Sequence, residues 1–334
     1  MEPGSKVRGV PKETFTEHFT FHGLSIAVSA DHPAVTECLQ TCLRHFPGDG
    51  AGAPDITFEF SSVPDAESHC VAKPEGHARH VYDPLEGEVL CFGDLLFVNY
   101  GDRGRMLCSP GDGQVTVSIL DSEVDNDWFV SHPMFIIAFM EILKHRGLYS
   151  LHAAGLCVDG QGILLPGTRG AGKSTLAIAL VRAGFGFLGD DTLFLAHRPD
   201  GLDALAFPDV IDLTEDTAAM FPELRHLLAQ PKDDSRPKHQ IRAEDVFPAN
   251  FLASCKPRVL VFPSVSDRAT SVITPMDKDE SLHQLAPNVL LTDSQASQRH
   301  LDALAELVRT TRTFRLETGR DFDEVGRRLK ALVT

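Results

Sequence analysis

The chain has 334 residues, of which 43% are hydrophobic and 23% are charged, a balance typical of a globular protein long enough for two domains. Its formal net charge of −16 excludes broad binding to nucleic acid or to an anionic membrane surface, because both need a basic surface. The longest apolar run, residues 134–143, is too short to span a bilayer and is interrupted by Glu141. It predicts a buried helix.

The cysteines and the N-terminus predict the compartment. None of the seven cysteines forms a C-x-x-C pair, which indicates reduced thiols and no zinc site. Residues 1–19 lack the apolar core of a signal peptide. We therefore expect a cytoplasmic protein.

The first part of the chain predicts a β-rich α+β domain over residues 1–128, whose role the sequence does not show. Residues 34–46 carry apolar side chains at helical spacing and predict its one helix. Residues 121–127 form an acidic turn that leads into the next helix. The expected strands, separated by Gly, Asp and Pro, are 18–30 (a strand pair), 56–60, 88–92, 95–100 and 114–120.

The second part, residues 129–334, predicts an α/β domain that opens with a helix over 131–146. Two strands, 148–158 and 162–167, are joined by a turn at Asp159-Gly160, a strong hairpin signal. The next helix is expected to end near Ala183, with Gly184 after it. The later elements are a strand at 185–191, a hairpin at 192–207, a mobile loop at 229–240, a buried strand at 257–263, helices at 281–288 and 294–311, and a terminal helix at 321–333, preceded by residues 313–318.

A phosphate-binding motif lies between the second of these strands and the following helix. Residues 167–175, GTRGAGKST, match G-x-x-x-x-G-K-[ST] in the context that the motif needs. The glycines let backbone N–H groups face phosphate oxygens, and the helix N-terminus adds partial positive charge. Lys173 is expected to contact the β- and γ-phosphates of ATP, and Ser174 to bind Mg²⁺. The candidate nucleotide-binding residues are Gly167, Thr168, Arg169 (its side chain facing solvent), Gly170, Ala171, Gly172, Lys173, Ser174 and Thr175.

Two adjacent carboxylates, Asp190 and Asp191, end the strand that follows the motif helix. Neighbouring side chains on a strand point to opposite sides, so the two acids are expected to do different work. One can hold the Mg²⁺ that Ser174 also touches, and the other can accept the proton of an attacking hydroxyl. The spacing does not decide which acid does which.

Residues 151–195 resemble the catalytic domain of the HPr serine kinase/phosphorylase family, which shares a core with ATP-dependent phosphoenolpyruvate carboxykinase. The resemblance is carried by His152 and Gly155, by the loop 167–175, and by Gly189-Asp190-Asp191. It implies an α/β P-loop kinase domain with a mixed sheet, transfer of the γ-phosphate of ATP to a serine hydroxyl of a protein or peptide, and assembly as a homo-oligomer. It also implies that His152 is an active-site histidine and that Asp190 and Asp191 form the acid pair.

The sequence departs from that family in two places. Thr175 follows the motif serine where HPr kinases carry an acidic residue, and their downstream R-G-L-G-type stretch is not visible. Whether HPr is the acceptor and whether phosphorolysis also occurs therefore stay open, and a precursor peptide is an alternative acceptor. The resemblance does not extend over residues 1–128.

A basic cluster stands out in this acidic chain. It comprises Arg236, Lys238, His239 and Arg242. Such a run is commonly a solvated face, but a basic loop could also fold over a triphosphate and neutralise charge in the transition state. Lys238 and Arg242 are the candidates for that role.

Together these features predict a Mg²⁺- and ATP-dependent kinase whose catalytic residues are His152, Lys173, Asp190 and Asp191, with Mg²⁺ on Ser174 and the two acids. Two alternatives remain: a kinase for a small-molecule hydroxyl on the same scaffold, and a regulatory module that binds ATP without transfer.

Overall fold

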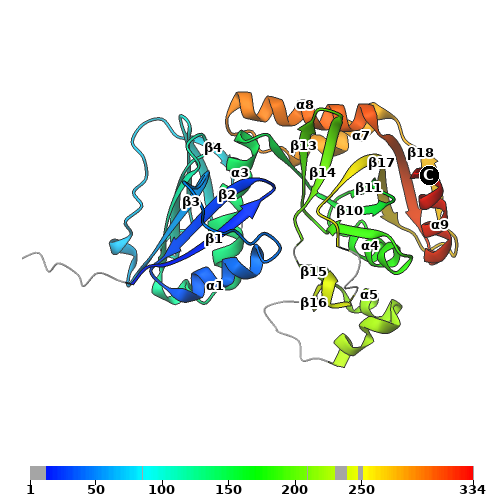
Figure 1. Ribbon diagram of the computed structural model, residues 1–334, viewed down its shortest axis with the longest axis horizontal. Coiled ribbons are helices and arrows are strands. Elements are labelled where there is room, and N and C mark those ends of the chain that lie inside the picture. The colour runs from blue at the N-terminus through cyan, green and yellow to red at the C-terminus, as the bar shows by residue number, and fades with distance from the viewer. Residues whose placement is uncertain (1–12, 85, 209, 230–238, 247–250, 334) are drawn as a thin grey trace, which may run out of the picture. The chain divides into compact units, whose positions relative to one another are not determined.

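A computed structural model (Figure 1) describes residues 13–84, 86–208, 210–229, 239–246 and 251–333. The chain divides into two compact units, Met1–His145 and Arg146–Thr334. Both are mixed α/β units with a large mixed sheet. Among the described residues, no helix combines the length and the apolar character that crossing a membrane requires.

The first unit is built on an eight-stranded sheet in the order β1-β2-β3-β8-β7-β6-β5-β4. Strand β3 pairs in parallel with β2 and with β8, and the other pairs are antiparallel. The strands are β1 (Phe15–Phe21), β2 (Leu24–Ala30), β3 (Ile56–Val63), β4 (Arg79–Tyr82), β5 (Glu88–Phe92), β6 (Leu95–Asn99), β7 (Gly104–Ser109) and β8 (Gln114–Leu120). The strands expected from the sequence are confirmed, whereas β4 and β7 were not predicted.

Helices pack on this sheet through aromatic side chains. Helix α1 (Pro33–Cys42) links β2 to β3, and a short 3₁₀ turn, η1 (Ala66–Ser68), lies between β3 and β4. A second 3₁₀ turn, η2 (Asp121–Glu123), follows β8 and leads into the helical segment 127–145. That segment is α2 (Asp127–Ser131), a π-helical turn η3 (His132–Ile136) and α3 (Ile137–His145). The π turn contains Pro133, which has no N–H to give to the helix. The rings of Phe135 and Phe139 contact those of Phe58 and Phe21 on the sheet.

These contacts belong to the first unit, which extends to His145. The helical segment 127–145 buries Phe129, Phe135 and Phe139 in the first unit, and this unit ends at His145. The sequence placed the boundary at 128/129 and assigned this helix to the second domain. Composition marked the acidic turn before the helix, but it could not show which sheet the helix covers.

The second unit is built on a nine-stranded sheet that runs β12-β10-β11-β17-β14-β13-β9, with β19 paired to both β17 and β18. Strands β11, β17 and β19 are mutually parallel. The bounds are β9 (Leu148–Leu151), β10 (Ala153–Val158), β11 (Gln161–Pro166), β12 (Gly186–Gly189), β13 (Leu193–Arg198), β14 (Gly201–Ala206), β17 (Ser254–Val265), β18 (Val272–Pro275) and β19 (Arg312–Thr318). A separate two-stranded sheet pairs β15 (Val210–Leu213) with β16 (His239–Arg242).

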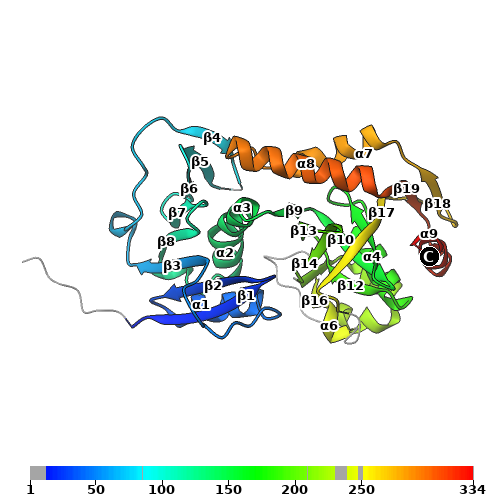
Figure 2. The ribbon, with the colours of Figure 1, turned by 45° about the horizontal axis from the view of Figure 1, so that its top comes forward.

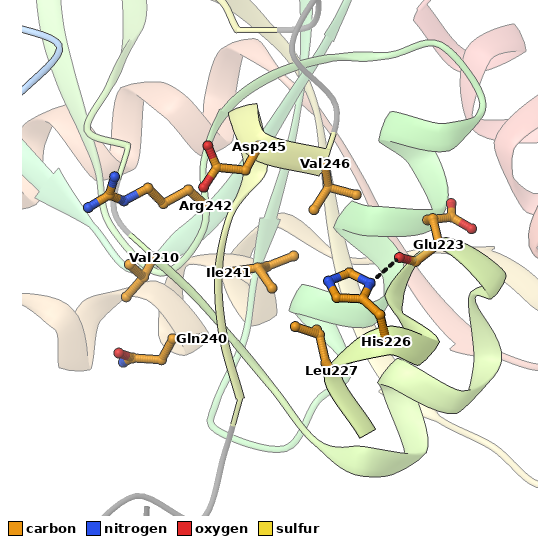
Figure 3. A pocket seen from close by; sticks show the side chains of 9 residues that line it. All are labelled: Val210, Glu223, His226, Leu227, Gln240, Ile241, Arg242, Asp245 and Val246. Atoms are coloured by element: carbon orange, nitrogen blue, oxygen red, sulfur yellow. Dashed lines mark hydrogen bonds between the residues drawn. The ribbon is translucent and has the colours of Figure 1, made fainter. Parts of the chain in front are cut away.

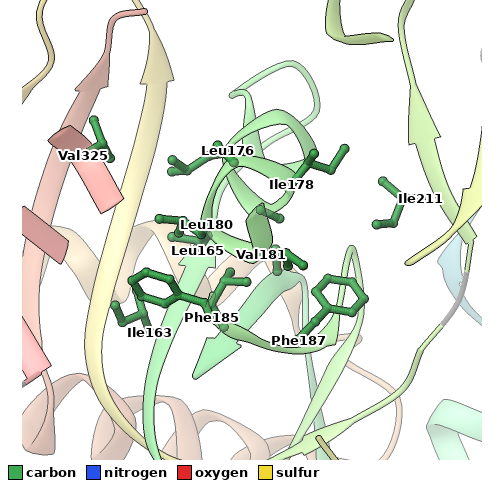
Figure 4. Close-up of a cluster of buried hydrophobic side chains, with 14 of the residues drawn as sticks. Ile163, Leu165, Leu176, Ile178, Leu180, Val181, Phe185, Phe187, Ile211 and Val325 are labelled. Atoms are coloured by element: carbon green, nitrogen blue, oxygen red, sulfur yellow. The ribbon is translucent and has the colours of Figure 1, made fainter. Parts of the chain in front are cut away.

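Helices cover both faces of this second sheet (Figure 2). On one face, α4 and α9 pack on Ile163 and Val261, and Figure 4 shows the side chains of this cluster. On the other face, α7 and α8 pack on Leu164 and Leu260. Consecutive strand residues thus enter opposite cores, as expected of strands buried on both sides. The helical elements are α4 (Lys173–Arg182), α5 (Glu215–Met220), η4 (Pro222–Ala229), α6 (Ala243–Val246), α7 (Lys278–Leu285), η5 (Ala286–Asn288), α8 (Ser294–Thr310) and α9 (Phe322–Val333).

Candidate functional site

The candidate residues meet at one edge of the second sheet. Strand β10 is antiparallel to both β11 and β12, so the start of β10 lies beside the ends of β11 and β12. His152 immediately precedes β10, the loop 167–172 follows β11, and Asp190 follows β12. Strand β17 is parallel to β11 and ends at the same edge. The topology therefore gathers segments that the sequence separates by a helix and several strands (Figure 1).

The loop 167–172 leaves the backbone N–H groups at the N-terminus of helix α4 available to a ligand. Gly170 and Gly172 adopt φ of 86° and 87°, a conformation that favours glycine. In the described structure, no side chain caps the first turn of α4, which begins at Lys173. The first N–H groups of a helix have no partner within it, and the helix dipole makes this end attractive to anions.

The ammonium group of Lys173 is held back against the loop. Lys173 is buried, and its Nζ donates to the carbonyl oxygens of Gly167 at 2.8 Å and of Thr168 at 3.4 Å. It also lies 3.1 Å from Nε2 of His152. These contacts place a positive charge at the mouth of the loop, within reach of any phosphate that the loop binds.

His152 bridges Lys173 and Asp191. The sequence predicted one strand over 148–158, but the chain breaks at His152 because β9 pairs with β13 whereas β10 pairs with β11 and β12. The ammonium group of Lys173 can only donate, so Nε2 accepts and the imidazole proton is on Nδ1. Nδ1 then donates to Oδ1 of Asp191 at 3.2 Å.

Close backbone packing places the two acids in different surroundings. Gly155 pairs with Gly189, and a Cβ at Gly189 would lie 2.9 Å from the carbonyl oxygen of Phe207. Asp190 follows at 4% exposure, whereas the side chain of Asp191 is 69% exposed. Asp191 has φ of 76°, a left-handed conformation that aspartate tolerates better than most residues.

Asp190 has the features of a cation ligand. Burial raises the pKa of its carboxyl above the ordinary 3.8, while a hydrogen bond from Ser174 opposes that rise, as does the charge of Lys173. Its Oδ1 is buried and has no hydrogen-bond partner among the residues that the structure describes. An unpartnered carboxylate oxygen beside the Ser174 hydroxyl is an oxygen set that suits Mg²⁺, which fills its other positions with water and phosphate.

Other predicted residues lie away from this cluster or only at its margin. The Thr175 hydroxyl pairs with that of Thr217 in α5 at 2.8 Å, so only its backbone faces the loop. The side chain of Arg169 is exposed, as expected. Arg242, exposed on β16, lines a pocket of about 490 Å³ (Figure 3) whose lining includes no residue of 167–175. Lys238 lies outside the described residues, as does most of the loop predicted at 229–240.

Two residues outside the predicted set contact the site. Thr217 bonds to Thr175, and Val265, the last residue of β17, lies so near Gly172 that a Cβ there would be 3.1 Å from its Cγ2. Neither carried a sequence signal, because a single threonine in a helix and a single valine at a strand end are common. Only the pairing of the strands and helices brings them to the loop.

Comparison with known proteins found similarity among solved structures. The chain is similar to the structure of the Hpr(Ser) kinase/phosphatase from Coxiella burnetii, with 14% sequence identity, coverage of 55% of this chain and 93% of that chain, and a TM-score of 0.30. No family model and no curated protein matches. A TM-score of 0.30 transfers neither activity nor residue roles, which must come from the site itself.

Proposed function

We propose that this protein is a Mg²⁺- and ATP-dependent kinase that transfers the terminal phosphoryl group to a hydroxyl of a protein or peptide. One observation carries the proposal: Lys173, Ser174 and the buried, unpartnered oxygen of Asp190 converge where the loop enters helix α4. If the end of β12 had only a structural role, it would not need a buried carboxylate beside a glycine-rich loop.

The loop and helix α4 bind the phosphates. Backbone N–H groups of the first turn, which no side chain caps in the described structure, donate to phosphate oxygens. Lys173 exchanges its bonds to the carbonyl oxygens of Gly167 and Thr168 for bonds to the phosphate chain. The charge-assisted bonds formed in this exchange are stronger than the neutral ones that are lost.

Ser174 and Asp190 would hold Mg²⁺. The ion would neutralise charge on the transferring phosphoryl group. The protein supplies the Ser174 hydroxyl and the Oδ1 of Asp190, which has no other partner among the described residues. We assign Mg²⁺ to Asp190 and not to Asp191 because Asp190 is the buried acid and the one that accepts a hydrogen bond from Ser174.

Asp191 would accept the proton of the attacking hydroxyl. Its side chain is exposed at the edge of the site, where an acceptor can reach it. The N–H of His152 holds Oδ1 of Asp191 at 3.2 Å and leaves Oδ2 to the acceptor. His152 in turn is fixed by Lys173, so the base is oriented by the residue that contacts the phosphates.

Exposure of the base favours a large acceptor. A kinase for a small molecule is expected to enclose the reacting hydroxyl, whereas Asp191 is 69% exposed. The lining of the pocket at Arg242 includes none of Asp190, Asp191 and His152. A serine in a protein or an extended peptide fits such an open edge, and a cytoplasmic protein of this kind fits the reduced cysteines.

The test combines nucleotide binding with phosphoryl transfer. The protein is incubated with Mg²⁺ and γ-labelled ATP, alone and with a lysate of its own host. We expect label on a protein or peptide, with transfer lowered about 100-fold or more by Asp191→Asn, which keeps Mg²⁺-ATP binding. Asp190→Asn should lose the Mg²⁺ dependence of binding. Asp200→Asn, at the hairpin turn at the far end of β13, is the matched control.

Three outcomes would contradict the proposal. Tight ATP binding without transfer to any acceptor would indicate a regulatory module. Label that accumulates only in a small metabolite would indicate a small-molecule kinase. Full transfer activity in both Asp190→Asn and Asp191→Asn would remove the acids from the chemistry altogether.

A further inference from the structure

An aliphatic side chain stands exposed beside the loop. Val265, at the end of β17, is 68% exposed, whereas the other aliphatic residues of this strand are buried. Isolated apolar residues on a surface are normal and need no explanation. Val265 differs from such residues because it lies beside Gly172 of the proposed phosphate-binding loop.

Strand β17 flanks the loop along its length. A Cβ at Gly172 would lie 3.1 Å from Cγ2 of Val265, and a Cβ at Gly167 would lie 3.8 Å from Cδ of Pro263. The loop therefore begins beside Pro263 and ends beside Val265. Any ligand lying on the loop at Gly172 has the valine methyl groups as a neighbour.

The two sides of the loop differ in chemistry. On the side of β10 and β12 stand His152, Asp190 and Asp191, which the proposed reaction places at the terminal phosphate and Mg²⁺. On the opposite side, β17 and β19 end without either acid. A triphosphate whose terminal group is directed to the acids must leave the loop with its nucleoside directed away from them. The side of Val265 is the one that remains.

We infer that Val265 forms the apolar contact for the nucleoside of the bound nucleotide. This inference rests on the proposed nucleotide binding at the loop. The ligand chemistry is the flat apolar face of a base or the carbon face of its ribose, which buries the valine methyl groups on binding. Because the contact is apolar, Val265 supplies affinity for a nucleoside without selecting one base by hydrogen bonds.

The backbone around Val265 is organised in advance. The N–H of Ser266 donates to the carbonyl oxygen of Thr318 at 3.0 Å, and that of Gly319 donates to the Ser271 hydroxyl at 2.8 Å. A Cβ at Gly319 would lie 2.8 Å from the carbonyl carbon of Thr270, so the two loops after β17 and β19 touch directly. A preformed surface binds a ligand without the entropic cost of ordering a loop.

The test compares two ligands that differ only in the nucleoside. ATP and inorganic tripolyphosphate are titrated with Mg²⁺ into the 334-residue protein, its Val265→Ala variant and its Lys173→Ala variant. Two methyl groups, about half buried by a nucleoside, correspond to about a fivefold change in affinity. We expect Val265→Ala to weaken ATP about fivefold and to leave tripolyphosphate unchanged, while Lys173→Ala weakens both. Leu252→Ala is the control, because Leu252 is an exposed leucine packed on Gly186 at the opposite end of β12.

Each other outcome overturns a different statement. Unchanged ATP affinity in Val265→Ala, with both ligands weakened by Lys173→Ala, would overturn the nucleoside contact and keep the phosphate site. Equal weakening of both ligands by Val265→Ala would show that the valine supports the loop and does not contact the nucleoside. Failure of the unmodified protein to bind either ligand would overturn the proposed function itself.

Discussion

At the scale of single residues, the burial of Asp190 that suits the proposed binding of a cation lowers the stability of the folded protein without one. Its oxygen Oδ1 is buried and finds no hydrogen-bond partner in the described part of the chain, and burial raises the pKa of its carboxyl above 3.8. A raised pKa means that the folded state disfavours the ionised form. The protein therefore carries a cost at neutral pH that a bound cation would remove.

The stability consequence can be tested without nucleotide or metal. We expect Asp190→Asn to raise the thermal midpoint at pH 7 by a few degrees, because a buried unsatisfied charged group costs about 1–3 kcal/mol and the amide is neutral. Below about pH 3.8 the carboxyl is protonated in both folded and unfolded states, so the gain should vanish there. It should grow as the pH rises above 3.8, where the unfolded state ionises first, and be complete above the folded-state pKa. Thermal melting at several pH values measures this, and a midpoint for Asp190→Asn at or below that of the unmodified protein at pH 7 would contradict it.

At the scale of elements, one hydroxyl pair ties the first turn of α4 to the first turn of α5. Thr175 and Thr217 meet at 2.8 Å, and Thr217 is buried. Valine has the shape of threonine without the hydroxyl. Thr175→Val leaves the Thr217 hydroxyl with Thr214, its other partner at 3.1 Å, and Thr217→Val leaves the Thr175 hydroxyl without Thr217. We expect each single variant to lose about 1 kcal/mol of the free energy of unfolding.

A double-mutant cycle isolates this tie. Since both substitutions remove the same bond, the double variant should lose clearly less than the sum of the two singles, as measured by urea unfolding. Thr175→Val should still bind ATP, because its side chain faces α5. Strictly additive losses would show that the hydroxyl pair carries no coupling, and loss of ATP binding in Thr175→Val would return its side chain to the phosphate site.

Local signals let the sequence predict the elements of the site but not its assembly. The turn Asp159-Gly160, with φ of 50° and 78°, and the end of α4 before Gly184 were predicted correctly, since each depends on residues within a few positions. The separation of β9 from β10 at His152 was not, because an unbroken apolar run does not reveal that its halves pair with different strands.

The contacts within the site follow the same division. The residue types of the loop and the acid pair were identified from their motifs. The burial of Asp190 and the exposure of Asp191 depend on the close pairing of Gly155 with Gly189 and on the turn after Asp190, which only the folded chain defines. The direction of the Thr175 side chain depends on α5, which is distant in sequence.

At the scale of the whole molecule, the boundary between the two units determines which fragment can carry the site. The two hydrophobic cores of the second unit are built from residues between Tyr149 and Val333 among those described. The helical segment 127–145 contributes to neither and buries Phe129, Phe135 and Phe139 in the first unit. Each such ring covers roughly 150–250 Å² of apolar surface.

Two fragments that differ only by residues 129–145 test the boundary. We expect residues 146–334 to fold alone and to bind ATP with the affinity of the full chain, because the fragment contains both cores and every loop and acid residue of the site. Residues 129–334 should associate and bind a hydrophobic dye, because Phe129, Phe135 and Phe139 lose the sheet that covers them. Size-exclusion chromatography, dye fluorescence and ATP titration measure the difference. A folded 129–334 fragment beside an unfolded 146–334 fragment would instead make the helix part of the second unit's fold, as its sequence position alone suggested.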